Sequence, residues 1–316
     1  MKRPTAALAI LALAGCGAQT EAPGSEPALT KALIVDGQSS IYHKDWADRT
    51  ALMKGMLEDT GLFTVEVATS PAIGEDNSRF LPAFTDYDVV VVNYEGDHWA
   101  EATEKAFEEY VAGGGGFVTI HATNNAFTDW KEWNRMIGVG GWGGRTEERG
   151  GVLRNRDKSD GPYLRLREGE WIRDTETEGV CGSHGNRHSF KIETQAADHP
   201  IMRGMPEAWM HDAEDELYDR LRGPAENVTV LAAAYSDPKT YKDPSRGVGE
   251  YEPQLMAIDY GQGRVFHTTL GHNAQTLAAK SFVTTFQRGA EWAATGDVTQ
   301  AIPADFPAVE QTESAK

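Results

Sequence analysis

Four consecutive valines, residues 89–92, lie between Asp88 and Asn93 and constrain the fold more than any other segment. A strand without polar residues is buried on both faces, which is typical of the centre of a parallel sheet. The sequence around it alternates between short apolar runs and helical patterns, predicted as strands at residues 32–35 and 64–67 and as helices at residues 46–59 and 99–111. This order predicts an α/β fold with crossover helices.

Four glycines, residues 113–116, end the second helix and lead into a strand at residues 117–121. A phosphate-binding loop would follow a strand and open a helix, so the glycine run is predicted to be a turn. Residues 130–198 lack clear periodicity and are predicted to form a long irregular insertion. The rest is predicted to contain strands at residues 229–234, 255–259 and 264–269, a hairpin turn at residues 259–264, and a closing helix at residues 274–294.

The first residues have the parts of a secretory signal in order: basic Lys2 and Arg3, an apolar stretch over residues 6–14, and small residues before Cys16. The apolar stretch is too short for a permanent membrane span, which needs about 20 residues. Residues 13–16, Leu-Ala-Gly-Cys, resemble a bacterial lipobox. Residues 1–15 are therefore predicted to be a lipoprotein signal peptide and Cys16 the lipidated residue, with ordinary cleavage as the alternative.

Residues 16–30 are small, polar and proline-containing, which predicts a flexible tether between Cys16 and a single domain at residues 31–296. Residues 297–316 are predicted to be a C-terminal tail. Two acyl chains on Cys16 would give stable membrane attachment. The predicted location is the cell envelope, at the outer membrane or the periplasmic face of a Gram-negative host, because Gly17 lacks the aspartate associated with inner-membrane retention.

The formal net charge of −18 argues against nucleic acid as a partner. A negative surface also repels anionic lipid headgroups, so the lipid anchor is predicted to be the sole membrane attachment. With Cys16 assigned to lipidation, Cys181 is the remaining cysteine of two. This count excludes an intramolecular disulfide and a cysteine zinc cluster.

Polar groups follow most of the predicted parallel strands, and ligands of open parallel sheets bind beyond those carboxyl ends. The candidate catalytic residues found there are His43, Glu95, His121 and His272. Neutral imidazoles near a carboxylate can share general acid and base roles near pH 7. The alternative is that each histidine is a hydrogen-bonded structural residue.

Five segments resemble the successive motifs of the ThuA-like family, in the same order: Val-Val-Val-Asn-Tyr-Glu-Gly at residues 90–96, the glycine run and its strand at residues 110–122, Asp-His-Pro-Ile-Met-Arg-Gly-Met-Pro at residues 198–206, Glu-Asp-Glu-Leu-Tyr at residues 214–218, and the hairpin and last strand at residues 260–272. The resemblance covers residues 31–296. It implies a flavodoxin-like parallel sheet of the class I glutamine amidotransferase type, with helices on both faces.

Amidotransferases of this type carry a cysteine nucleophile in the turn after one strand, and here that turn carries His121. The resemblance therefore implies a protein that is not a glutamine amidotransferase. Cys181 lies in the irregular segment without a strand-to-helix turn to expose it, and is interpreted as a bystander.

Founding members of the family are associated with the use of trehalose and related disaccharides, in which sugars are oxidised to 3-keto forms. The resemblance implies a lyase, isomerase or hydrolase acting on 3-keto-glycosides. A 3-keto group acidifies the hydrogen at C2, so a base could start elimination or isomerisation while a histidine or a metal polarises the carbonyl. Glu95 or His121 is predicted as the base, with His43 and His272 as electrophilic partners.

A divalent metal ion is left open as a cofactor, with the strand-end histidines and a carboxylate as one ligand set. Asp215 with Glu216 is another acidic candidate. His184 and His188 are four residues apart, but the glycines around them argue against a helix that would bring both imidazoles to one face.

The predicted substrate-binding residues are Asn93, Tyr94, Trp130, Trp142 and Arg145. The two tryptophans, together with Trp133, could stack on sugar rings, and Arg145 and Asn134 could bond to hydroxyls. The alternative is that the tryptophans hold the insertion against the core through their buried area. A noncatalytic sugar-binding envelope lipoprotein is the rival function.

Overall fold

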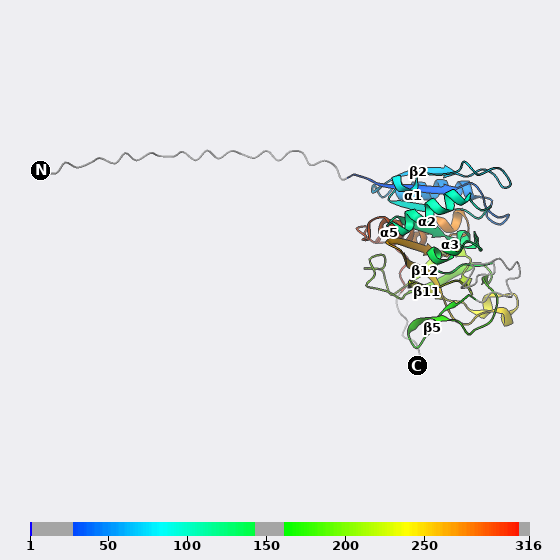
Figure 1. The fold of residues 1–316 in the computed structure, drawn as a ribbon. Helices are drawn as coiled ribbons and strands as arrows, with labels where there is room; N and C mark the ends of the chain where they lie inside the picture. The colour runs from blue at the N-terminus through cyan, green and yellow to red at the C-terminus, as the bar shows by residue number, and fades with distance from the viewer. Residues whose placement is uncertain (2–27, 143–160, 310–316) are drawn as a thin grey trace.

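A nine-stranded sheet dominates the computed structural model, which describes residue 1 and residues 28–142 and 161–309 (Figure 1). The strand order is β2-β1-β3-β4-β13-β12-β11-β8-β9. Cys16 and Arg145 lie outside the described residues. None of the described helices is long and apolar enough to cross a membrane.

The first half of the sheet is parallel, and its elements have the bounds β1 (Thr30–Asp36), α1 (Trp46–Glu58), β2 (Phe63–Thr69), β3 (Val89–Val92), α2 (Glu101–Ala112), β4 (Gly116–Ile120) and β13 (Gly263–Thr268). Parallel pairing joins β2 to β1, β1 to β3, β3 to β4, and β4 to β13. The valine strand β3 is fully buried between β1 and β4. The predicted parallel sheet and its central strand are confirmed.

The second half of the sheet is antiparallel and contains β8 (His188–Thr194), β9 (Ala208–Asp215), β11 (Val228–Tyr235) and β12 (Tyr251–Tyr260). The predicted hairpin turn joins β12 to β13, where Tyr260 pairs with Gly263. The strands β11 and β12 were predicted, whereas β8 and β9 were not. The sheet is therefore mixed, with a central parallel part.

Residues 130–198 contain more regular structure than the predicted irregular insertion. The described part holds α3 (Lys131–Ile137), the hairpin of β5 (Tyr163–Arg167) and β6 (Glu170–Asp174), β7 (Ser183–His184) and β8. The short β7 pairs with β10 (Tyr218–Asp219). These elements are two to seven residues long, which is too short for a periodic pattern to separate them from loops.

Alternate residues of the central strands face two separate cores, as the pleat of a strand requires. Ala32 and Ile34 of β1 pack in one core, which α1, α4 (Ala274–Leu277) and α5 (Lys280–Thr295) cover. Leu33 and Val35 pack in the other, which α2 and α3 cover. Helices therefore lie on both faces, as predicted, and the predicted closing helix is two helices.

The described residues after α5 pack on the sheet. Phe306 is buried against Trp209 of β9, and Ala308 forms a bridge with the same tryptophan. Residues 297–309, the first part of the predicted C-terminal tail, thus cover the outer strand β9.

Candidate functional site

A cavity of ≈ 760 Å³ lies beyond the carboxyl ends of the parallel strands. Three of the four predicted catalytic residues line it directly, namely His43, Glu95 and His272. The fourth, His121, is fully buried beside His272, with 3.2 Å between His121 Nε2 and His272 Nδ1. The structure thus brings together side chains that are up to 229 residues apart in the sequence, as the strand-end argument predicted.

His121 follows β4 and begins the 3₁₀ turn η2 (His121–Asn125) with φ +46°. A non-glycine residue with positive φ marks a sharp, strained turn, and such residues cluster at functional sites. His121 Nδ1 lies 2.7 Å from the carbonyl oxygen of Thr269, so this nitrogen carries the proton and donates it. The lone pair is consequently on Nε2.

Burial lowers the pKa of His121 to about 3, because the charged form would lose its hydration. The ring is therefore neutral at physiological pH. Its Nε2 accepts a hydrogen bond of 2.8 Å from the hydroxyl of Tyr218. Burial raises the pKa of Tyr218 well above its usual range, so this hydroxyl keeps its proton and acts as the donor.

His43 lies in the loop between β1 and α1 and is 5 % exposed. Its Nδ1 is 3.2 Å from Glu95 Oε2 and 3.1 Å from Ser40 Oγ. Glu95 comes from the segment after β3, so the pair connects the ends of two adjacent strands. A carboxylate acceptor places the His43 proton on Nδ1 and leaves the lone pair on Nε2.

His272 lies in the loop between β13 and α4, and Asp215 holds that loop in place. The Asp215 carboxylate accepts hydrogen bonds from the backbone N–H groups of Gly271, at 2.8 Å, and His272, at 3.2 Å. It also accepts one of 3.0 Å from His211 Nε2. Burial alone would raise the pKa of Asp215, but these hydrogen bonds and the nearby histidines hold it well below its usual range.

Glu216, the next residue, lines the cavity and reaches two of the histidines. Its Oε2 is 3.3 Å from His272 Nδ1 and 3.7 Å from His121 Nε2. Burial opposes ionisation, but the hydrogen bond with His272 and the surrounding histidines lower the pKa of Glu216 to about 2. Glu216 is therefore an anion inside the site.

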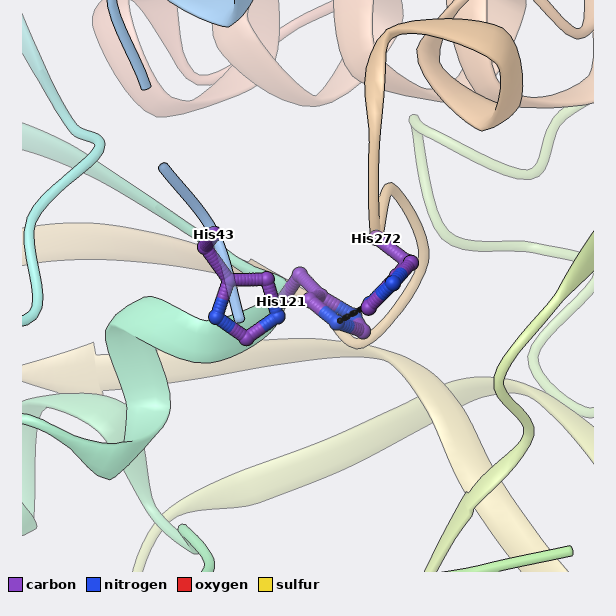
Figure 2. A group of neighbouring side chains, drawn as sticks. All are labelled: His43, His121 and His272. Carbon is purple, nitrogen blue, oxygen red and sulfur yellow. Dashed lines mark hydrogen bonds between the residues drawn. The ribbon is translucent and has the colours of Figure 1, made fainter. Parts of the chain in front are cut away.

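The three imidazoles form a compact triangle (Figure 2). The ring centroids of His43 and His121 are 5.2 Å apart, those of His43 and His272 are 5.0 Å apart, and those of His121 and His272 are 5.3 Å apart. The interplanar angles lie between 75° and 79°. One ring nitrogen from each histidine falls within 4.8 Å of the others, so this group could hold a metal ion.

An aromatic wall stands beside the triangle. Trp142 is half-buried and packs on Tyr218, with 4.6 Å between the ring centroids. The ring centroids of His184 and Trp142 are 5.8 Å apart, and both side chains line the cavity. Of the predicted substrate-binding residues within the described chain, Trp142 is the one that the structure places at the cavity.

The side chains of Asn93, Tyr94 and Trp130 are 2 %, 2 % and 7 % exposed and do not line the cavity, so the structure places these three predicted substrate-binding residues away from it. Asn93 donates to the carbonyl oxygen of Trp46 and to Thr50, which fixes α1 on the sheet. The Tyr94 hydroxyl donates to the carbonyl oxygen of Asp97. These three side chains are therefore part of the buried interior.

Trp130 and Trp133 belong to a buried aromatic cluster with Trp99, Phe107 and Phe127. The rings of Trp130 and Trp133 stack with a centroid distance of 5.5 Å. Asn134 is buried and donates to the carbonyl oxygen of Thr128. For these residues, the alternative that they hold the segment against the core is the better description.

Several residues that line the cavity are not among the predicted site residues: Ser40, Tyr42, Asn125, His184, Arg187, Glu216 and Tyr218. In the sequence, Glu216 stands beside Asp215 and His184 four residues before His188, which suggests other metal pairs than the one at the cavity. Tyr218 belongs to the family-like segment at residues 214–218, and nothing in its sequence pattern indicates a place at the site. Cys181 is buried and donates to the carbonyl oxygen of Gly140, and it does not line the cavity.

The family model described as "ThuA: Trehalose utilisation" matches residues 31–293. A crystal structure of a ThuA-like protein from Parabacteroides merdae is 41% identical, with a TM-score of 0.79 over 89% of this chain and 95% of that one. A ThuA-like protein from Bacteroides uniformis is 19% identical, with a TM-score of 0.58 over 88% and 96%. The search of curated proteins found no match.

Proposed function

Because the chain belongs to the ThuA family of trehalose utilisation, we propose that it is a carbohydrate-catabolism enzyme that acts on 3-keto-glycosides or related disaccharides as a lyase, isomerase or hydrolase. The observation that carries the proposal is the gathering of His43, His121, His272 and two carboxylates at one cavity. A purely structural histidine has no need of such neighbours, whereas proton transfer from a sugar does.

The geometry favours Glu95 over His121 as the base that removes the acidic hydrogen at C2. A group with a pKa of about 3, such as His121, accepts protons poorly at neutral pH. Glu95 lines the cavity, and its side chain is 21% exposed. His43 would then orient the carboxylate through the 3.2 Å contact between Nδ1 and Oε2.

The aromatic wall supports a sugar as the ligand. Trp142 is half-buried and lines the cavity, with its ring packed on that of Tyr218, and the apolar face of a pyranose ring packs well on such an aromatic side chain. Asn125 and Arg187 line the same cavity and offer groups that can bond to hydroxyls. The ≈ 760 Å³ volume falls within the range of small-molecule sites.

The test is incubation of the purified protein with a panel of 3-keto-disaccharides and their unoxidised parents, followed by product analysis. Conversion of a keto-sugar should be lost in Glu95→Gln and in His121→Ala. The matched control is His188→Ala, because His188 lies on β8 outside the cavity and should keep full conversion.

The rival function, a noncatalytic sugar-binding protein, uses the same aromatic wall. Thermal stabilisation by the sugars, without conversion of any of them by the wild type, would support the binding protein and contradict the enzyme. An enzyme whose base is removed in Glu95→Gln should still bind its ligand while turnover disappears. Loss of both binding and turnover in that variant would remove Glu95 from the catalytic role.

We also propose that the protein is held at the cell envelope by lipidated Cys16. The support is the order of basic, apolar and small residues before this cysteine.

A further inference from the structure

His43 carries a buried nitrogen without a hydrogen-bond partner. Its Nε2 is enclosed and unpaired, whereas its Nδ1 faces Glu95 and Ser40. A buried polar atom without a partner is unfavourable, and such an atom in a native fold calls for an explanation. The unpaired nitrogen belongs to the triangle of His43, His121 and His272 (Figure 2).

The hydrogen bonds around the triangle are those that orient metal-binding histidines. His121 donates through Nδ1 to a backbone carbonyl, and His43 donates through Nδ1 to a carboxylate. Ligating histidines in proteins almost always use their second nitrogen in this way, which fixes the tautomer and aims the lone pair at the metal. In both His121 and His43, Nε2 therefore carries the lone pair that a metal ion needs.

The separations between the donor atoms fit a small coordination sphere. His121 Nε2 and His272 Nδ1 are 3.2 Å apart, and Glu216 Oε2 is 3.3 Å from His272 Nδ1 and 3.7 Å from His121 Nε2. Ligands at the usual 2.0–2.1 Å from a tetrahedral zinc ion are about 3.4 Å apart. The ligand atoms of His121, His272 and Glu216 already have about this spacing. His43 completes the triangle, with a ring nitrogen within 4.8 Å of those of His121 and His272.

The charges around the triangle favour a cation. The Glu216 carboxylate lies against His272 and His121, and the carboxylates of Asp215 and Glu95 belong to the same group of side chains. The buried Arg49 interacts with Asp215 and Glu95 but is a single positive charge. Neutral imidazoles with a carboxylate form the ligand type that suits divalent transition metals better than magnesium or calcium.

We propose that His43, His121 and His272, with the Glu216 carboxylate as fourth ligand, bind one divalent transition-metal ion. Binding requires the Tyr218 hydroxyl to release His121 Nε2, which it now contacts at 2.8 Å. It also requires the His272 proton to lie on Nε2, so that Nδ1, which now faces Glu216 at 3.3 Å, has a lone pair for the metal. Tyr218 would then be free to donate to a ligand in the cavity that it lines. The use of the ion in catalysis, where it would polarise a substrate carbonyl, rests on the proposed function, whereas the binding itself does not.

The test measures metal binding directly, with Zn²⁺ and Co²⁺ added to the untagged chain from residue 17 onward, which retains every described helix and strand. After dialysis, the wild type should retain about one ion per chain, and titration calorimetry should give the same stoichiometry. Co²⁺ should give the visible absorption of a low-symmetry, nitrogen-rich site. Mg²⁺ should compete poorly.

His43→Ala and His272→Ala should each weaken Zn²⁺ binding by roughly tenfold or more, since even residues behind the ligands usually contribute that much. His188→Ala is the matched control and should bind as the wild type does. Melting in EDTA shows whether each variant is folded, and added Zn²⁺ should raise the melting temperature of the wild type and the control only. Failure of the folded wild type to bind, or undiminished binding in both variants, overturns the proposal.

The outcomes for metal and for function are separable. Full conversion of a keto-sugar by chelated, metal-free protein would remove the metal from the mechanism and leave the proposed function standing. Tight binding of one ion without conversion of any sugar on the panel would support the metal site and contradict the proposed function.

Discussion

Asp215 is the residue on which the site depends most, although it does not line the cavity. Its buried carboxylate accepts hydrogen bonds from His211 and from the backbone N–H groups of Glu216, Gly271 and His272. We expect Asp215→Asn to lower the free energy of unfolding by about 3 kcal/mol, because an amide cannot serve all these donors. Urea unfolding measures this change.

The matched control for this prediction is Asp212→Asn, three positions earlier on the same strand. Asp212 is exposed and accepts from the backbone N–H groups of Lys280 and Ser281 at the start of α5. Asparagine can also accept there, so the loss should stay below about 1 kcal/mol. Equal losses in the two variants would contradict the central role of Asp215.

Glu252 gives a pH-dependent stability that does not involve the triangle. Burial raises the pKa of Glu252 to about 8, with the nearby Asp219 adding to the rise and Arg165 opposing it. The folded chain keeps a proton that the unfolded chain releases near pH 4.5, so the free energy of unfolding should fall as the pH rises from about 5 to about 8.

Glu252→Gln cannot release a proton, so its stability should fall less steeply over this range. Urea unfolding at several pH values measures the difference between the two slopes. Glu250→Gln is the control, because Glu250 also contacts Arg165 but its side chain is 35% exposed. Equal slopes in Glu252→Gln and the wild type would show that the carboxyl is already ionised in the fold.

The sequence predicted which candidate catalytic residues lie together better than it predicted which candidate substrate-binding residues face the cavity, and the reason is physical. Strand ends of a parallel sheet converge by topology, so His43, Glu95, His121 and His272 could be grouped without coordinates. Whether a side chain such as Trp130 faces a cavity or the core depends on packing. Short segments without periodicity do not encode this.

Packing also limits which strands can be predicted from the sequence. The central strands were predictable because full burial leaves an unbroken apolar run, as in β3. The unpredicted strands β8 and β9 bury only some of their residues, including Phe190 and Trp209. Glu216 and Tyr218 follow β9 directly, so missing that strand also concealed their place at the site.

Two helices offer a matched test of how tightly they pack. A methyl group added at Gly55 of α1 would meet no atom within 4 Å, whereas one at Gly289 of α5 would overlap the buried ring of Phe266. We expect Gly55→Ala to raise the free energy of unfolding by about 0.5–1 kcal/mol through helix propensity. Gly289→Ala should lower it by about 1–3 kcal/mol through overpacking.

Thermal and urea unfolding of the two alanine variants would check both signs in one experiment. Opposite signs would support the close contact between α5 and β13, the strand that leads to His272. Stabilisation in both variants would mean that Phe266 can move aside without cost.

At the scale of the whole molecule, the acidic surface and the N-terminal segment lead to one prediction about location. A chain with a net charge of −18 is repelled overall by anionic lipids, so we expect any membrane attachment to come from another source. The predicted lipidated residue, Cys16, supplies one. Two or more acyl chains hold a protein at a bilayer stably, whereas a single chain does so only marginally.

We expect the full chain, expressed in a bacterium that processes lipoproteins, to fractionate with membranes and to partition into detergent. Cys16→Ser should move it to the soluble fraction, with the signal segment retained or cleaved elsewhere. Cys181→Ser is the matched control, because Cys181 is buried and serine can donate to Gly140 in its place. Membrane association that persists in Cys16→Ser would show that the chain is attached in another way, and mass spectrometry of the N-terminal peptide would identify the acylated residue.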